Sequence, residues 1–144
     1  MDNIELSKAF IRFMVSMKKQ IKECLNLNCS LKLTEQQFIT LFILNKNKKI
    51  TLKKLSTYIC VSTSSLCIML TRMMKEGLVY REVDEKDRRN TFYSLTDKGI
   101  NLIDKEIESK VHNVEEKIMN LSLSQKEKLC NAIKDIEEII DILE

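Results

Sequence analysis

The sequence of 144 residues contains no proline, no tryptophan and only two glycines. In an average protein glycine and proline together make up roughly 12% of the residues, and they mark most tight turns. A chain with so few of them has little room for an all-β sandwich or a flexible linker. The composition therefore predicts a mainly α-helical protein, and the length suits one compact subunit with a core of its own.

Long apolar runs are also absent, since no stretch approaches the ~20 residues that a membrane-spanning helix needs. The amino terminus, MDNIELSKAF, lacks the basic and then apolar order of a signal peptide. We therefore expect a cytoplasmic protein with no membrane partner.

The chain offers few groups for catalysis, metal binding or disulfides. It has a single histidine, His112, no glycine-rich phosphate loop, and an odd number of cysteines with no CxxC pair: Cys24, Cys29, Cys60, Cys67 and Cys130. Such thiols are best interpreted as small apolar side chains in a reducing compartment. We expect no enzymatic activity, no metal and no other cofactor.

Charge is distributed unevenly along the chain, although the net charge is only +3. Residues 46–98 carry 12 basic and 6 acidic side chains, whereas residues 104–144 carry 6 basic and 11 acidic ones. A basic middle beside an acidic tail suits a lobe that faces nucleic acid and a separate helical lobe. The simpler alternative is a set of solvated charges without a function.

Apolar side chains recur at helical spacing in the first segment and in the last two. The stripes consist of Leu6, Phe10, Phe13, Met17 and Ile21, then Ile100, Ile103, Ile107, Val111, Val114, Ile118 and Leu121, then Leu129, Ile133, Ile136, Ile140 and Leu143. The first helix, about residues 3–25, carries a second stripe at Ile4, Ile11 and Val15. A helix that is apolar on two sides needs two surfaces to cover it, and we expect the second to come from another subunit.

Hydroxyl side chains predict where the helices begin. Capping boxes are expected at Thr34 with Gln37 and at Ser124 with Glu127, and simpler caps at Thr51, at Ser62 or Thr63, and at Thr96. A loop is expected at Asn26–Leu33 and a short strand at Ile50.

The block from Ser62 to Gly99 predicts a helix, a glycine stop and a hairpin. The helix, about residues 63–76, has an apolar face of Leu66, Met69, Leu70 and Met73 and an outward face of Ser64, Cys67, Ile68, Thr71 and Lys75. Gly77 fits a left-handed helix stop, and two β-prone runs, 78–83 and 91–95, flank a charged tip at 84–90. A helix coupled to a basic hairpin suits DNA, because the helix can enter the major groove while the hairpin reaches the adjacent minor groove.

This order of elements resembles the MarR family of winged helix-turn-helix regulators. The most specific match is DRRNTFYSLTDKG, an Asp-x-Arg followed after five residues by Leu-Thr-x-x-Gly, at Asp87, Arg89, Leu95, Thr96 and Gly99. The run EGLVYR (76–81) is similar to the family's passage from recognition helix to wing, and LTEQQF (33–38) to the start of its second helix. The resemblance spans almost the whole chain.

The resemblance implies an obligate homodimer on double-stranded DNA, with a DNA-binding lobe at about 34–98 and dimerisation helices at about 3–25 and 97–144. Arg89 is then the wing arginine, favoured in a narrow A·T-rich minor groove by the negative potential there, and Asp87 is its orienting partner. The residues expected to contact DNA are Lys53, Lys54, Ser62, Thr63, Ser64, Ser65, Cys67, Ile68, Thr71, Arg72, Lys75, Lys86, Asp87, Arg88 and Arg89.

The recognition helix departs from the family at Cys67 and Ile68, where many members carry a polar or basic side chain. Ile68 can contact a thymine methyl group, but it cannot form the bidentate bond that reads guanine. The binding mode is therefore predicted and the operator sequence is not.

Family members respond to small lipophilic or phenolic ligands in a cleft between the dimer helices and the DNA-binding lobe, to cysteine oxidation, or to zinc. We expect a repressor that such a small ligand releases from DNA. One alternative is a cysteine-oxidation sensor, although the usual thiol near the start of the first helix is absent and no basic residue adjoins Cys67. The other alternative is a helical module that sequesters a protein partner without DNA, for which a basic wing would be unnecessary.

Overall fold

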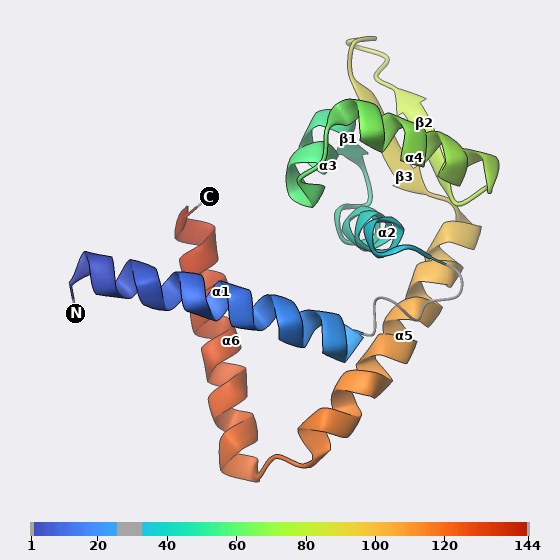
Figure 1. Ribbon diagram of the computed structural model, residues 1–144. Helices are drawn as coiled ribbons and strands as arrows, with labels where there is room; N and C mark the ends of the chain where they lie inside the picture. The colour runs from blue at the N-terminus through green and yellow to red at the C-terminus, as the bar shows by residue number, and fades with distance from the viewer. Residues whose placement is uncertain (1, 26–32, 144) are drawn as a thin grey trace.

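The computed structural model describes residues 2–25 and 33–143, shown in Figure 1. The element order is α1 (Asn3–Leu25), α2 (Glu35–Asn47), β1 (Ile50–Thr51), α3 (Leu52–Ile59), α4 (Thr63–Lys75), β2 (Val79–Val83), β3 (Thr91–Leu95), α5 (Asp97–Met119) and α6 (Leu123–Leu143). The expectation of a mainly helical fold with a small β-hairpin is confirmed. The loop expected at Asn26–Leu33 lies outside the described residues, apart from Leu33, and so does Cys29.

The hairpin belongs to a three-stranded antiparallel sheet in the order β1-β3-β2. The short strand expected at Ile50 is present and pairs with β3, an association that the sequence did not predict. Ile50 lies opposite Tyr93, and Tyr93 lies opposite Arg81 on β2. Directly opposed residues point to the same side of a sheet, so these three side chains form one row across it.

The core lies in the lobe formed by α2, α3, α4, the sheet and the first turns of α5. Its fully buried side chains are Leu41, Leu44, Leu55, Leu66, Leu70, Met73 and Ile103. Of the four residues predicted on the inner face of α4, Leu66, Leu70 and Met73 are therefore buried, while Met69 is half-buried. The sheet closes this core through Ile50, Val79, Tyr93 and Leu95.

Most of the expected helix caps are confirmed, with one correction. The backbone N–H of Gln37 donates to Thr34 Oγ1 at 3.2 Å, and the backbone N–H of Thr34 donates to Gln37 Oε1 at 2.9 Å. The box expected at Ser124 with Glu127 is wrong, because the cap of α6 is made two residues earlier by Ser122 and Gln125. Both pairs fit the capping pattern, and the start of α6 at Leu123 places Ser124 inside the first turn.

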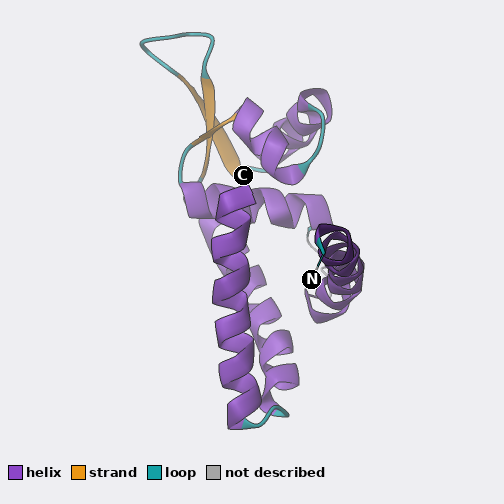
Figure 2. Ribbon diagram, turned by 90° about the vertical axis from the view of Figure 1, so that its left-hand side faces the viewer, coloured by secondary structure: helices purple, strands orange, loops and turns teal. Residues whose placement is uncertain are grey.

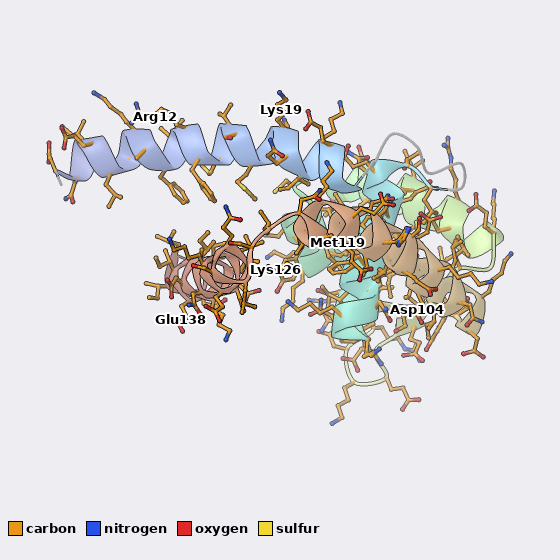
Figure 3. The ribbon with its side chains drawn as sticks, turned by 90° about the horizontal axis from the view of Figure 1, so that it is seen from below. Arg12, Lys19, Asp104, Met119, Lys126 and Glu138 are labelled. Atoms are coloured by element: carbon orange, nitrogen blue, oxygen red, sulfur yellow. The ribbon has the colours of Figure 1, made fainter. Side chains whose placement is uncertain are left out.

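Two long helices lie outside this lobe. These are α1 and α6: helix α5 leads away from the lobe, α6 turns back from the end of α5, and α1 passes in front of α6 in the view of Figure 1, while Figure 2 shows α1 end-on and beside α6. Side chains of Arg12 and Lys19 lie on the side of α1 that faces away from α6 in Figure 3. Large apolar side chains of α1 and α6 stay exposed in the single chain: Ile4, Leu6, Phe10, Ile11, Phe13, Met14, Val15, Met17, Ile21, Leu129, Ile133, Ile139, Ile140, Ile142 and Leu143. Among the described residues, no helix has the length and apolar character needed to cross a membrane.

Candidate DNA-binding surface

Helices α3 and α4 form a helix-turn-helix. Thr51 caps α3 by accepting a hydrogen bond from the backbone N–H of Lys54 at 3.3 Å. Cys60 adopts the left-handed conformation, with φ of 53°, and the N–H of Val61 donates to Ser56 O at 3.2 Å, which turns the chain sharply. Ser62, the first of the two expected caps, accepts from the backbone N–H of Ser65 and starts α4. The turn therefore sets the angle between α3 and α4.

The outward side of α4 is exposed and mostly uncharged. Lys53 and Lys54 on α3 are exposed. The residues of α4 and its cap that are expected to contact DNA are exposed as well: Ser62, Thr63, Ser64, Ser65, Cys67, Ile68, Thr71, Arg72 and Lys75. Ile68 is 61% exposed, so its side chain is free to make an apolar contact with another molecule. The hydroxyl of Thr71 donates to Cys67 O at 2.7 Å, so its oxygen remains available as an acceptor. This face has the size and chemistry of a major-groove reading surface.

The end of α4 is fixed to the start of α5. Gly77 has φ of 71°, as a left-handed helix stop requires, and its carbonyl accepts from Thr96 Oγ1 at 2.6 Å. Lys98 Nζ donates to Glu76 O at 2.7 Å. At Gly99 an added Cβ would lie 2.1 Å from Leu78 O, so only glycine fits this crossing. Both glycines of the chain thus serve to hold α4 against α5.

The wing tip is ordered by its aspartates. The N–H of Asp84 donates to Asn90 O at 2.9 Å, and the N–H of Asn90 donates to Asp87 O at 2.9 Å. The carboxylate of Asp87 accepts from the backbone N–H of Arg89 at 3.0 Å. The Asp87 side chain therefore holds the backbone that carries Arg89. Lys86, Arg88 and Arg89 are all exposed at this tip.

Two cationic side chains at the sheet were not among the residues predicted from the sequence: Lys49, just before β1, and Arg81 on β2. Lys49 Nζ lies 2.7 Å from Glu82 Oε2 and 4.7 Å from the centroid of the Phe92 ring, and the hydrogen bond to Glu82 raises its pKa. Arg81 is exposed and lies opposite Tyr93. Burial raises the pKa of Tyr93 and the nearby Cys67 thiol group raises it further, while the neighbouring Arg81 lowers it. The only signal for Arg81 in the sequence was its place in EGLVYR.

An apolar cleft of about 740 Å³ is lined by residues of α2 and α5, and Ile21 of α1 closes part of it. Its remaining walls are formed by Glu35, Phe38, Ile39, Phe42, Ile107, Lys110, Val111, Val114, Glu115 and Ile118. Lys110 is only 6% exposed; its ammonium lies 4.7 Å from the Phe38 ring centroid and 3.8 Å from Glu106 Oε2. Much of the apolar stripe predicted on α5 therefore lines this cleft.

A second groove, of about 530 Å³, runs between α1 and α6 and is lined mainly by apolar side chains.

A helix-turn-helix followed by a hairpin with an arginine-bearing tip defines a winged helix-turn-helix protein. The family model described as "MarR family" matches residues 33–91. The HTH-type transcriptional regulator SarZ of Staphylococcus aureus (strain USA300) is 31% identical over 128 residues, which cover 88% of this chain and 83% of that protein. The chain belongs to the MarR family.

Solved structures share this fold. Wild-type MarR from E. coli in its apo form has a TM-score of 0.73 at 23% identity, covering 85% of this chain and 93% of that one. FabT of Streptococcus pneumoniae, solved in complex with DNA, has a TM-score of 0.69 at 18% identity and covers 99% of this chain and all of the other. At these identities the likeness concerns the fold.

Proposed function

We propose that this protein is a transcriptional repressor that binds a pseudo-palindromic operator as a homodimer. The observation that carries the proposal is the joint exposure of the α4 outer face and of the Arg89 wing in one lobe. Helix α4 enters the major groove, and the wing places Arg89 in the adjacent minor groove. We assign the DNA-binding lobe to about residues 34–98 and the dimerisation helices to about 3–25 and 97–144.

The unpaired apolar surface of α1 and α6 supports a dimer. Helix α6 contains no buried residue in the described chain, and nearly half of the Ile133 side chain is exposed, at 48%. A helix of 21 residues with an apolar stripe gains stability only when that stripe is covered. A second copy of the chain provides matching stripes on its own α1 and α6. The pairing also places two copies of α4 on one face of the duplex, as a two-fold operator requires.

The cleft between α2 and α5 supports control by a small lipophilic or phenolic ligand. Helix α2 belongs to the DNA-binding lobe, whereas α5 leads to the dimerisation helices, so an occupant that separates them moves the lobe relative to the dimer. The walls combine aromatic and aliphatic side chains with the ammonium of Lys110 and the carboxylates of Glu35 and Glu115, and the ammonium suits an aromatic acid or phenolate bound beside it. Ligand binding thus favours a spacing of the two recognition helices that does not match DNA.

Selection of bound duplexes from a random 30-base-pair library tests the DNA-binding part of the proposal. We expect the selected sites to be pseudo-palindromes with half-site centres about 10–10.5 base pairs apart, since a two-fold dimer reads successive major grooves. Footprints should show dyad symmetry. Selected or protected sites without dyad symmetry would contradict the dimeric operator, and a failure to enrich any duplex would contradict DNA binding itself.

Release of the selected duplex by a panel of aromatic acids and their neutral amides tests ligand control. We expect acids to dissociate the complex at lower concentration than the matched amides, because Lys110 attracts the anion. In Lys110→Met, which retains an unbranched apolar stem, this preference for acids should be lost while DNA affinity is retained. If neither acids nor amides weaken the complex, ligand control through this cleft is wrong.

A further inference from the structure

A duplex that receives α4 in its major groove and the wing in the adjacent minor groove has one phosphate strand between the two grooves. On the protein, the segment between the end of α4 and the wing tip at 84–90 should therefore lie along this phosphate strand. That segment is strand β2 (Figure 1). A cationic side chain on the face of β2 that is turned toward α4 would therefore meet this phosphate strand.

Arg81 occupies this position. It lies in the middle of β2 and directly opposite Tyr93 on β3, so both side chains leave the same face of the sheet. That face also carries Ile50, Val79 and Leu95, which are buried in the core with the inner side of α4. Tyr93 is 4% exposed and lies near enough to Cys67 of α4 for the two groups to interact electrostatically. Arg81 thus lies at the junction between recognition helix and wing, at the exposed end of a row that begins in the core.

The charge of Arg81 remains available at this junction. Among the described residues, no carboxylate lies within ion-pair distance of its guanidinium. Lys49 provides the contrast, since its ammonium lies 2.7 Å from the Glu82 carboxylate on the opposite face of the sheet. Tyr93 lies directly opposite Arg81, and its phenol interacts with the guanidinium without carrying a charge that would neutralise it. We expect this neighbour to restrict where the guanidinium can lie. A guanidinium restricted in this way loses less conformational entropy when it binds a phosphate.

We propose that Arg81 is a phosphate-binding residue of the operator complex and that Tyr93 is the residue that positions it. The inference rests on the DNA-binding function proposed above and extends it to the backbone strand between the two grooves. The contact carries no base preference, because phosphates are the same in every sequence. It fixes the register of α4 relative to the wing on the duplex.

Affinity for the selected duplex, measured over a series of salt concentrations, tests this assignment. We expect Arg81→Ala to bind roughly tenfold more weakly at physiological salt and to lower the slope of log K against log salt by about 0.9. Arg81→Lys should retain the slope, because the charge is kept. Tyr93→Phe should weaken binding about threefold with the slope unchanged, and should add nothing to Arg81→Ala. Lys46→Ala, which removes an exposed charge of α2 that is not among the residues expected to contact DNA, is the control and should leave both quantities unchanged.

Ethylation interference on the same duplex locates the contact. With the wild-type protein, ethylated phosphates between the major and minor grooves of each half-site should block binding. In Arg81→Ala, one of these phosphates in each half-site should cease to interfere. An unchanged salt slope together with an unchanged interference pattern would overturn the proposal even if affinity fell. Failure of the wild-type protein to select any duplex would instead refute the DNA-binding function on which the inference rests.

Discussion

The carboxylate of Asp87 accepts a hydrogen bond from the backbone N–H of Arg89, with an Oδ1–N distance of 3.0 Å. The backbone carbonyl of Asp87 also accepts a hydrogen bond from the N–H of Asn90 at 2.9 Å. Asp87 therefore stabilises the turn through both its side chain and its backbone. A turn held in this way presents Arg89 with its backbone already ordered. Ordering before binding reduces the entropy lost when the arginine enters a minor groove.

Removing the Asp87 carboxylate gives a prediction that distinguishes this role from simple electrostatics. Asp87→Ala makes the tip more positive, which on charge alone would strengthen DNA binding. We expect it instead to weaken binding by about 1 kcal/mol, because the turn that carries Arg89 loses its hydrogen bond. Asp87→Asn, which keeps the acceptor oxygen, should bind at least as well as the wild type. Tighter binding by Asp87→Ala, measured by fluorescence anisotropy, would contradict the proposed role.

Substituting Arg89 by alanine should weaken operator binding by about 1–3 kcal/mol, with most of the loss on sites with a narrow minor groove. Arg88→Ala is the control, since it removes the same charge from the neighbouring tip residue. That control should cost less and should not depend on groove width. Equal losses for the two variants on all duplexes would mean that the tip acts only as diffuse positive charge.

The dimer interface can be tested with Ile133→Glu, which places a charge in the groove between α1 and α6. Ile133 lines this groove in the single chain, and the core of the DNA-binding lobe does not include it. We expect a monomer with intact helical content, because a carboxylate buried at the interface opposes association. Sedimentation at micromolar concentration should show a dimer for the wild type and a monomer for the variant. A wild-type protein that sediments as a monomer would refute the proposed interface.

The two glycines should differ in what they tolerate. Gly99→Ala places a Cβ 2.1 Å from Leu78 O, a backbone atom, so we expect a loss of roughly 1–3 kcal/mol in the free energy of unfolding. In Gly77→Ala the added Cβ meets only Lys98 Cδ, at an ordinary van der Waals distance of 4.0 Å, but the residue keeps a positive φ, and the change should cost about 1 kcal/mol. Urea denaturation measures both. A larger loss for Gly77→Ala would mean that the crossing at Gly99 adjusts more easily than its geometry indicates.

Much of the fold could be predicted because local chemistry decides it. The caps at Thr34, Thr51 and Thr96 depend on hydroxyl groups and nearby N–H groups within one turn, and all three are confirmed. The capping box of α6 was misplaced, because two overlapping pairs, Ser122 with Gln125 and Ser124 with Glu127, satisfy the same pattern and the pattern alone does not choose between them. The pairing of β1 with β3 joins segments about 40 residues apart and has no local signal.

The candidate site was predicted less completely than the fold. Exposed residues of α4 and the tip follow from helical periodicity and from the wing motif. The position of Arg81 beside Tyr93 depends on strand register, and the burial of Lys110 in the α2–α5 cleft depends on how two distant helices pack. Neither position follows from a short motif. Each depends on the packing of segments that are far apart in the sequence.

Cys67 provides the sharpest test of how α4 faces DNA. Its thiol is exposed on α4, and it lies near Tyr93, on the side of the helix next to the wing. We expect alkylation with N-ethylmaleimide to abolish operator binding, because the added bulk occupies space needed by the DNA backbone or base edges. Cys67→Ser should bind nearly as well as the wild type and should resist the reagent, even though Cys60 and Cys130 are also exposed. If protein shown by mass spectrometry to carry the label at Cys67 still binds the selected duplex normally, then this side of α4 does not face DNA.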